Sequence, residues 1–181
     1  MIAKQLFTAL NVLHINDFIH RDIKMENLLI REGAADGSVL EVKLTDFGLS
    51  TKVRVGESAT DFVGSKFYLS PEIYQNLPYS QKTDIWSAMI TLYILFVGDM
   101  PFYSDDIDDI KDRVIHHDFA AEFTEANPQW EHLGAEARDF MQLGFAKDTD
   151  ERPTSAELLE HPWLRDVELP LQKPYATKTD T

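Results

Sequence analysis

The sequence predicts one mainly α-helical domain with a small β-hairpin at one edge. Two observations support this prediction: apolar residues recur at helical spacing in several segments, and two short strand-like runs flank a glycine-containing turn. With 181 residues and 44% hydrophobic content, the chain is long enough to bury one sizeable core. We therefore expect helices packed around one core.

The first part of the chain predicts a helix followed by the hairpin. Apolar residues at helical spacing indicate an amphipathic helix over residues 2–17. Strand-like runs at 28–30 and 39–44, with the turn between them, indicate the hairpin. This pairing would place Asn27 and Asp46 side by side, because each residue lies where a paired strand meets a loop.

The remainder of the chain predicts further helices. Segment 49–69 lacks clear periodicity, as functional segments often do. Ser70 and Thr83 are predicted N-caps, and the helix after Thr83 runs to Val97 and is apolar nearly all round, so it should be buried. Three more helices are expected at 107–115, at 135–145 and after the capping box Thr154–Glu157.

Composition excludes several classes of function. The net charge of -14 disfavours nucleic acid and anionic membranes as partners and favours basic peptides or proteins. The absence of cysteine excludes disulfides and cysteine-ligated zinc. The longest apolar run, Ile85–Val97, is too short to span a membrane, and no secretory signal is visible. We expect an intracellular protein, cytoplasmic by default with the nucleus as an alternative.

The residues that suit catalysis are concentrated in two short stretches, His20–Asn27 and Thr45–Gly48. Asp22 can accept a hydroxyl proton, and Lys24 can offset the charge of a moving phosphoryl group. Asn27 and Asp46 supply oxygen ligands of the kind that Mg²⁺ prefers. This set suits phosphoryl transfer, in which positioning and charge neutralisation supply most of the catalysis.

The order Asp-Lys-Asn, Asp-Phe-Gly and Pro-Glu resembles the signature of protein kinases. The resemblance extends through Ser70-Pro71-Glu72, Asp84-Ile85-Trp86 and Glu151-Arg152-Pro153. It covers residues 1–165 and implies the C-terminal, larger lobe of the kinase fold, followed by a polar tail over 166–181.

Finer features indicate the subgroup. Lys24, two residues after Asp22, is the form found in serine/threonine kinases. The long hairpin, Tyr93–Leu95 and His161–Leu164 resemble the calcium/calmodulin-dependent group, including calcium-dependent kinases. The resemblance implies ATP-dependent phosphorylation of Ser or Thr in protein or peptide substrates, with Mg²⁺, or alternatively Mn²⁺, as the metal.

The resemblance also implies roles for individual residues. The cofactor would be bound by Lys24, Asn27 and Asp46, the last two as metal ligands. Ser65 would bond to the catalytic aspartate and lysine, and Asp84 would anchor the backbone of the His20–Arg21 turn, here called the catalytic turn. A buried structural ion pair would join Glu72 and Arg152.

Two acidic residues have both a functional and a plain interpretation. Glu26 aligns with a family glutamate that reads a basic residue upstream of the phosphorylated one; otherwise it is an exposed loop acid. Asp61 stands where many kinases carry an activating phosphothreonine, and its carboxylate could pair with Arg21 without phosphorylation. Alternatively, Asp61 is a surface acid, and Thr60 or Ser58 is the phosphorylated residue.

One core position departs from the family. Met89 replaces the usual glycine of the central helix. Extra volume in a packed core would cost about 1–3 kcal/mol, so we expect strained packing there.

The nucleotide half of the kinase signature does not occur in these 181 residues. A glycine-rich loop, a strand lysine and its partner glutamate are all missing. Two interpretations follow. The chain is the C-terminal lobe of an active serine/threonine kinase, inactive alone and completed by an upstream segment or partner; or it is a catalytically inactive interaction module. The complete Asp22, Lys24, Asn27 and Asp46 set favours the first.

Overall fold

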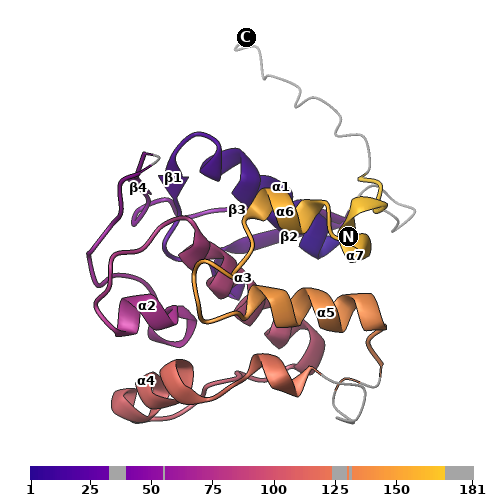
Figure 1. Ribbon diagram of the computed structural model, residues 1–181. Helices are drawn as coiled ribbons and strands as arrows, with labels where there is room; N and C mark the ends of the chain where they lie inside the picture. The colour runs from indigo at the N-terminus through magenta and orange to yellow at the C-terminus, as the bar shows by residue number, and fades with distance from the viewer. Residues whose placement is uncertain (33–39, 55, 124–129, 131, 170–181) are drawn as a thin grey trace.

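The computed structural model describes residues 1–32, 40–54, 56–123, 130 and 132–169 (Figure 1). The predicted turn between the hairpin strands and most of the predicted tail lie outside these residues. The helices are α1 (Ile2–His14), α2 (Pro71–Tyr74), α3 (Lys82–Val97), α4 (Ile107–His116), α5 (Ala135–Gly144), α6 (Ser155–Leu159) and α7 (Pro162–Arg165). Short 3-10 turns lie at η1 (Met25–Asn27), η2 (Lys66–Tyr68) and η3 (Ala120–Glu122).

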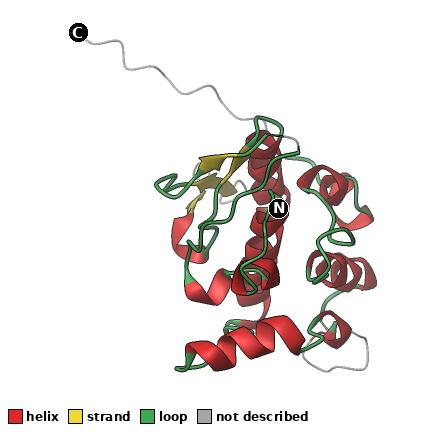
Figure 2. Ribbon diagram, turned by 60° about the vertical axis from the view of Figure 1, so that its left-hand side comes forward, coloured by secondary structure: helices red, strands yellow, loops and turns green. Residues whose placement is uncertain are grey.

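Two small antiparallel sheets accompany the helices. The predicted hairpin pairs β2 (Leu28–Glu32) with β3 (Leu40–Leu44), and Leu28 lies opposite Leu44. A second sheet, which the sequence did not predict, pairs β1 (Phe18–Ile19) with β4 (Thr51–Lys52). Strands this short are held by their surroundings and leave no alternating pattern in the sequence. Figures 1 and 2 show the strands at one end of the molecule and α4 at the other.

Helix α1 lies against α6 and β3 and carries the chain into the catalytic turn. Its buried face includes Leu6, Phe7 and Leu10, as the apolar spacing predicted. The helix ends at His14, earlier than the predicted residue 17. Asp17 has a left-handed backbone with φ of 67°, which a continuing helix cannot accommodate.

Helix α3 is the buried central helix that the sequence predicted, with every residue from Thr83 to Tyr93 buried. Its predicted cap was wrong. The Thr83 hydroxyl lies 2.8 Å from the Ser70 hydroxyl, and both side chains are buried. Ser70 keeps the N-cap position of α2 without a capping hydrogen bond from its side chain. The two hydroxyls therefore satisfy each other and tie the start of α2 to the start of α3.

The helices at 107–115 and 135–145 and the capping box are confirmed within a residue of their predicted ends. Thr154 accepts a hydrogen bond from the Glu157 backbone, and Glu157 accepts one from the Thr154 backbone. This reciprocal pair fixes the start of α6, because it satisfies two backbone N–H groups that the helix leaves free.

Met89 is fully buried, and a glycine on a neighbouring helix leaves room for its side chain. A Cβ added to Gly144, at the end of α5, would lie 2.2 Å from the Met89 methyl carbon and 2.5 Å from its sulfur. The volume gained on α3 is thus offset by volume missing on α5.

Substituting Gly144→Ala should therefore destabilise the chain by about 1–3 kcal/mol, although alanine is ordinarily the better helix residue by about 1 kcal/mol. Urea unfolding would measure the change. Adding Met89→Ala should remove most of the penalty of the alanine at 144, because the two side chains compete for one space. Equal penalties in both backgrounds would show that the two sites do not interact.

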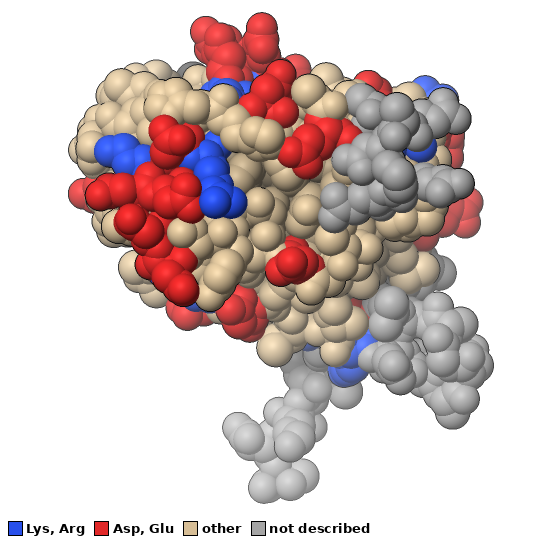
Figure 3. All heavy atoms as spheres, turned by 90° about the horizontal axis from the view of Figure 1, so that it is seen from below, with Lys and Arg blue, Asp and Glu red and all other residues tan. Residues whose placement is uncertain are grey.

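The surface near α4 is acidic. Figure 3 shows acidic side chains outnumbering lysine and arginine on the face seen from below. Asp106 caps α4 by accepting a hydrogen bond from the Asp108 backbone at 2.9 Å.

Within the described ranges, no helix combines the length and the apolar character needed to cross a membrane.

Candidate active site

The catalytic turn is held by a buried aspartate on α3. Asp84 accepts hydrogen bonds from the backbone N–H groups of His20, at 2.8 Å, and Arg21, at 2.9 Å. The His14 ring also lies 3.0 Å from the same carboxylate. Arg21 has a left-handed backbone with φ of 69°, a conformation that needs surrounding support in a non-glycine residue. Asp84 supplies that support, so the next residue, Asp22, is held in a fixed position.

Asp22 is buried at the centre of a polar cluster. Its carboxylate accepts a hydrogen bond from the Ser65 hydroxyl at 2.7 Å and lies 2.8 Å from the Lys24 ammonium. The Asn27 amide donates to this carboxylate at 3.1 Å and to the Asp22 backbone carbonyl at 2.8 Å. Lys24 also donates to Ser65 at 2.9 Å. The structure therefore brings together all four residues predicted to be catalytic.

These contacts set the charge state of Asp22. Burial by itself would raise the pKa of the Asp22 carboxyl, but hydrogen bonds from Lys24, Ser65 and Asn27 outweigh it and hold the pKa below its ordinary value. Asp22 is therefore ionised at neutral pH and can receive a proton. Its contribution to stability is present above the ordinary aspartate pKa and is lost as the pH falls through the lowered value.

The hairpin brings the two predicted metal ligands to one edge of the site. Because Leu28 pairs with Leu44, the residues just outside the strands are also adjacent: Thr45 donates its backbone N–H to the Asn27 carbonyl at 2.9 Å. Asp46 follows directly and is exposed. The Asn27 amide nitrogen is engaged with Asp22, which leaves its oxygen for a cation. One amide and one carboxylate oxygen fit a hard divalent ion.

A close backbone contact joins segment 49–69, which corresponds to the activation segment of the kinases that the sequence resembles, to the catalytic turn. Gly64 has φ of 116°, and a Cβ there would lie 2.6 Å from the Arg21 carbonyl oxygen. Glycine is thus required on both conformational and steric grounds. This contact sets Ser65, the next residue, against Asp22.

The Arg21 side chain reaches the activation segment at a second point. Its guanidinium donates to Leu49 O at 2.6 Å, to Asp61 at 3.0 Å and to the Tyr79 hydroxyl at 3.3 Å. The Tyr79 hydroxyl in turn donates to the Asp61 backbone carbonyl at 3.0 Å. Burial would lower the pKa of Arg21, but Tyr79 and Asp61 raise it, so the arginine is permanently charged.

Glu26 lies at the exposed rim of the site, on η1, beside a buried tyrosine. Burial, together with the negative charge of Glu26, raises the pKa of the Tyr68 hydroxyl to about 12. Tyr68 therefore stays protonated, while the exposed Glu26 carboxylate remains within reach of a ligand.

The predicted Glu72–Arg152 pair is present and fully enclosed. Arg152 donates to the two Glu72 carboxylate oxygens at 2.8 and 3.0 Å. Its remaining N–H groups donate to the carbonyls of Ala146, Lys82 and Lys147. All five guanidinium donors are thus used, and the pair connects α2 to the loop before α6.

Three participants were missed by sequence reasoning: His14, Tyr68 and Tyr79. Each acts through a side chain that reaches a distant segment, and none belongs to a motif. His14, for example, lies at the end of α1 and contacts both Asp84, at 3.0 Å, and Ser155, at 3.0 Å. Helical periodicity identified the helix but carried no information about these polar contacts.

This geometry, an ionised aspartate held by lysine, asparagine and serine beside an Asp-Phe-Gly turn, agrees with the sequence comparisons. A family model described as the protein kinase domain matches residues 1–164. The chain belongs to the protein kinase family. Its mainly helical structure with small sheets is compatible with part of that fold.

Individual relatives agree on the subgroup. The chain is 36% identical over 167 residues to calcium-dependent protein kinase 15 of Oryza sativa subsp. japonica, covering 91% of this chain and 29% of that protein. It is 35% identical over 162 residues to the calcium/calmodulin-dependent protein kinase type II alpha chain of Drosophila melanogaster, covering 89% and 29%. The predicted resemblance to this serine/threonine kinase group is thus confirmed. The chain spans about three tenths of the length of these relatives.

Proposed function

We propose that residues 1–165 form the C-terminal lobe of a serine/threonine protein kinase and contribute the substrate and metal half of its active site. The observation that carries the proposal is the buried Asp22 carboxylate, held by Lys24 at 2.8 Å and Ser65 at 2.7 Å. A catalytic base needs this fixed, ionised arrangement, whereas a simple binding module has no use for it.

The residues divide the work of phosphoryl transfer. Asp22 would orient the substrate Ser or Thr hydroxyl and accept its proton, while Lys24 would offset negative charge on the transferred phosphoryl group. Because the pKa of Asp22 is lowered, the carboxylate is a weak base. It therefore suits a reaction in which positioning comes first and the proton moves late. Asn27 and Asp46 would hold Mg²⁺, which when bound neutralises phosphate oxygens of ATP.

The substrate is a protein or peptide with basic residues near the phosphorylated position. Glu26 is exposed beside the catalytic turn, and the chain carries a net charge of -14. Both features favour a cationic peptide. Relatives include proteins named calcium-dependent and calcium/calmodulin-dependent kinases, which supports Ser or Thr as the acceptor.

The nucleotide half of the site would come from another segment or partner. Leu29 is 57% exposed, Ile30 44% and Phe47 50%, so apolar side chains are uncovered beside the predicted metal ligands. A nucleotide-binding lobe over this face would bury them and complete the site. The alternative is a catalytically inactive module that binds kinases or substrates. In that case a binding partner would cover this face, and no phosphoryl transfer would occur there.

Titrating the 181-residue chain with Mg-ATP in a calorimeter tests whether the nucleotide half of the site is supplied from elsewhere. We expect weak or absent binding, because the glycine-rich loop and the strand lysine of the kinase signature do not occur in these 181 residues. Tight binding would contradict the division of the site between two lobes, because this chain would then hold the nucleotide by itself.

Asp61 would replace an activating phosphate by pairing with Arg21. Its side chain is 69% exposed, so the pair should contribute only about 0–1 kcal/mol to stability. Substituting Asp61→Ala in the complete kinase should nevertheless lower its activity several-fold, because the activation segment loses an ordering contact. Asp61→Glu should retain most of the activity. Unchanged activity in the alanine variant would refute the role.

A further inference from the structure

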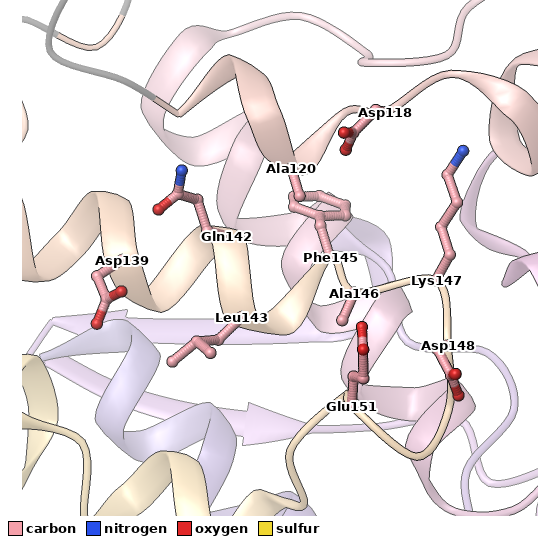
Figure 4. A pocket seen from close by; sticks show the side chains of 10 residues that line it. All are labelled: Asp118, Ala120, Asp139, Gln142, Leu143, Phe145, Ala146, Lys147, Asp148 and Glu151. Carbon is pink, nitrogen blue, oxygen red and sulfur yellow. The ribbon is translucent and has the colours of Figure 1, made fainter.

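A hollow of about 560 Å³ lies between η3, the C-terminal half of α5 and the loop that follows it. Figure 4 shows side chains from these three segments arranged around it. None of its lining residues belongs to the candidate active site. Its size lies within the range of about 300–1,000 Å³ that is typical of ligand sites.

The floor of the hollow is apolar and rigid. Leu143 is 40% exposed, and Ala120, Phe145 and Ala146 complete the apolar lining. Phe145 is itself buried and packs against the rings of three other aromatic residues, Trp86, Phe119 and Phe123. The surface is therefore formed before any ligand arrives, which lowers the cost of binding.

The loop on one side of the hollow is also fixed. The Arg152 guanidinium donates to the carbonyls of Ala146 and Lys147, and the Arg152 backbone N–H donates to the Asp148 carbonyl at 2.9 Å. The buried arginine that pairs with Glu72 thus also shapes this second surface.

The rim of the hollow is acidic and only partly neutralised. Four carboxylates lie on it: Asp118, Asp139, Asp148 and Glu151. Lys147 lies near Asp118, and His161 lies 3.0 Å from Asp139. Within the described part of the chain, neither Asp148 nor Glu151 pairs with a cationic side chain. Two exposed negative charges therefore border an uncovered leucine.

The chemistry of the hollow excludes several kinds of occupant. No group of three His, Cys, Asp or Glu side chains able to hold a metal ion occurs among the described residues. Phosphates and anionic lipids would be repelled by the rim. A second copy of the chain is disfavoured because each copy carries a net charge of -14.

We infer that this hollow is a docking site for a protein segment that presents an apolar side chain flanked by arginine or lysine. The apolar side chain would pack on Leu143 and Ala146, and the basic groups would pair with Asp148 and Glu151. The buried apolar side chain would supply most of the affinity. The charge pairs at the rim would supply most of the specificity. The site could hold a substrate or regulator independently of the catalytic cluster.

Fluorescence anisotropy with a labelled peptide would test the inference on the full chain. The probe is a short alanine-based peptide with two leucines one helical turn apart and flanking arginines, and it lacks Ser, Thr and Tyr. We expect saturable binding that weakens as salt is added. Either Asp148→Asn/Glu151→Gln or Leu143→Gln should weaken it by about tenfold or more. The same peptide with glutamates in place of arginines should not bind.

Two controls make the outcome decisive. Asp108→Asn/Glu136→Gln removes the same charge from exposed positions on α4 and α5 and should leave the affinity unchanged. Adding Glu26→Gln to the wild type and to the hollow variants removes any contact of the probe with the proposed substrate site, and the hollow variants should still bind about tenfold more weakly in this background. Since all the substituted side chains are exposed, each variant should remain folded, which thermal unfolding would verify. The inference is overturned if the wild type does not bind, or if the hollow variants bind as tightly as the controls.

Discussion

Replacing Arg152→Met should destabilise the chain by about 3–5 kcal/mol, a large share of the stability of a typical domain. The arginine is completely buried and donates to both oxygens of Glu72. Removing it leaves a buried carboxylate without a counter-charge and three backbone carbonyls without donors. Urea unfolding, followed by far-ultraviolet circular dichroism, would measure the loss.

Two further variants test the origin of that loss. The double substitution Arg152→Met/Glu72→Gln should be less destabilising than the sum of the two single changes, because no isolated charge remains. Arg165→Met removes an exposed arginine paired with Asp166 and should cost less than about 1 kcal/mol. A loss as small for Arg152→Met as for Arg165→Met would contradict a structural role for the buried pair.

Replacing Asp22→Asn should reduce phosphate transfer by the complete kinase at least about a hundredfold. Asparagine keeps the shape but has no negative charge, so it can neither accept the substrate proton nor balance the Lys24 ammonium 2.8 Å away. The loss should appear in kcat and little in KM, because the carboxylate acts on the reacting hydroxyl more than on substrate binding. Steady-state assays at saturating ATP would show this division.

A matched change provides the control for this substitution. Asp166→Asn removes an aspartate charge from an exposed site beside Arg165, outside the catalytic cluster, and should leave kcat unchanged. If Asp22→Asn left kcat as unchanged as Asp166→Asn, the buried cluster would have no part in catalysis. That result would support the interpretation of the chain as an inactive binding module.

Much of the site could be predicted because its residues are close in sequence. Asp22, Lys24 and Asn27 lie within six consecutive residues, and the hairpin that brings Asp46 beside them has a recognisable strand pattern. The buried α3 and the capping box at Thr154 were predicted for the same reason. Their signals are local: an apolar run and a short motif.

What the sequence did not reveal depends on contacts between distant segments. From the sequence, Met89 suggested overpacking of the core. Gly144 on α5 offsets the volume of Met89, but nothing in the sequence indicates that the two residues are in contact. Thr83 has the residue type of a cap, but the buried hydroxyl of Ser70 competes for its hydrogen bond. The acidic hollow around Leu143 likewise forms only when α5, η3 and the following loop come together.

Transfer of labelled phosphate from ATP, measured with the protein as its host expresses it, tests the central proposal most directly. The acceptors would be matched basic peptides that differ only in carrying Ser, Thr, Tyr or Ala at one position. We expect Mg²⁺-dependent labelling of the Ser and Thr peptides and none of the Tyr or Ala peptides. Absence of labelling in every peptide and in the protein's own host extract, or labelling of tyrosine alone, would contradict it.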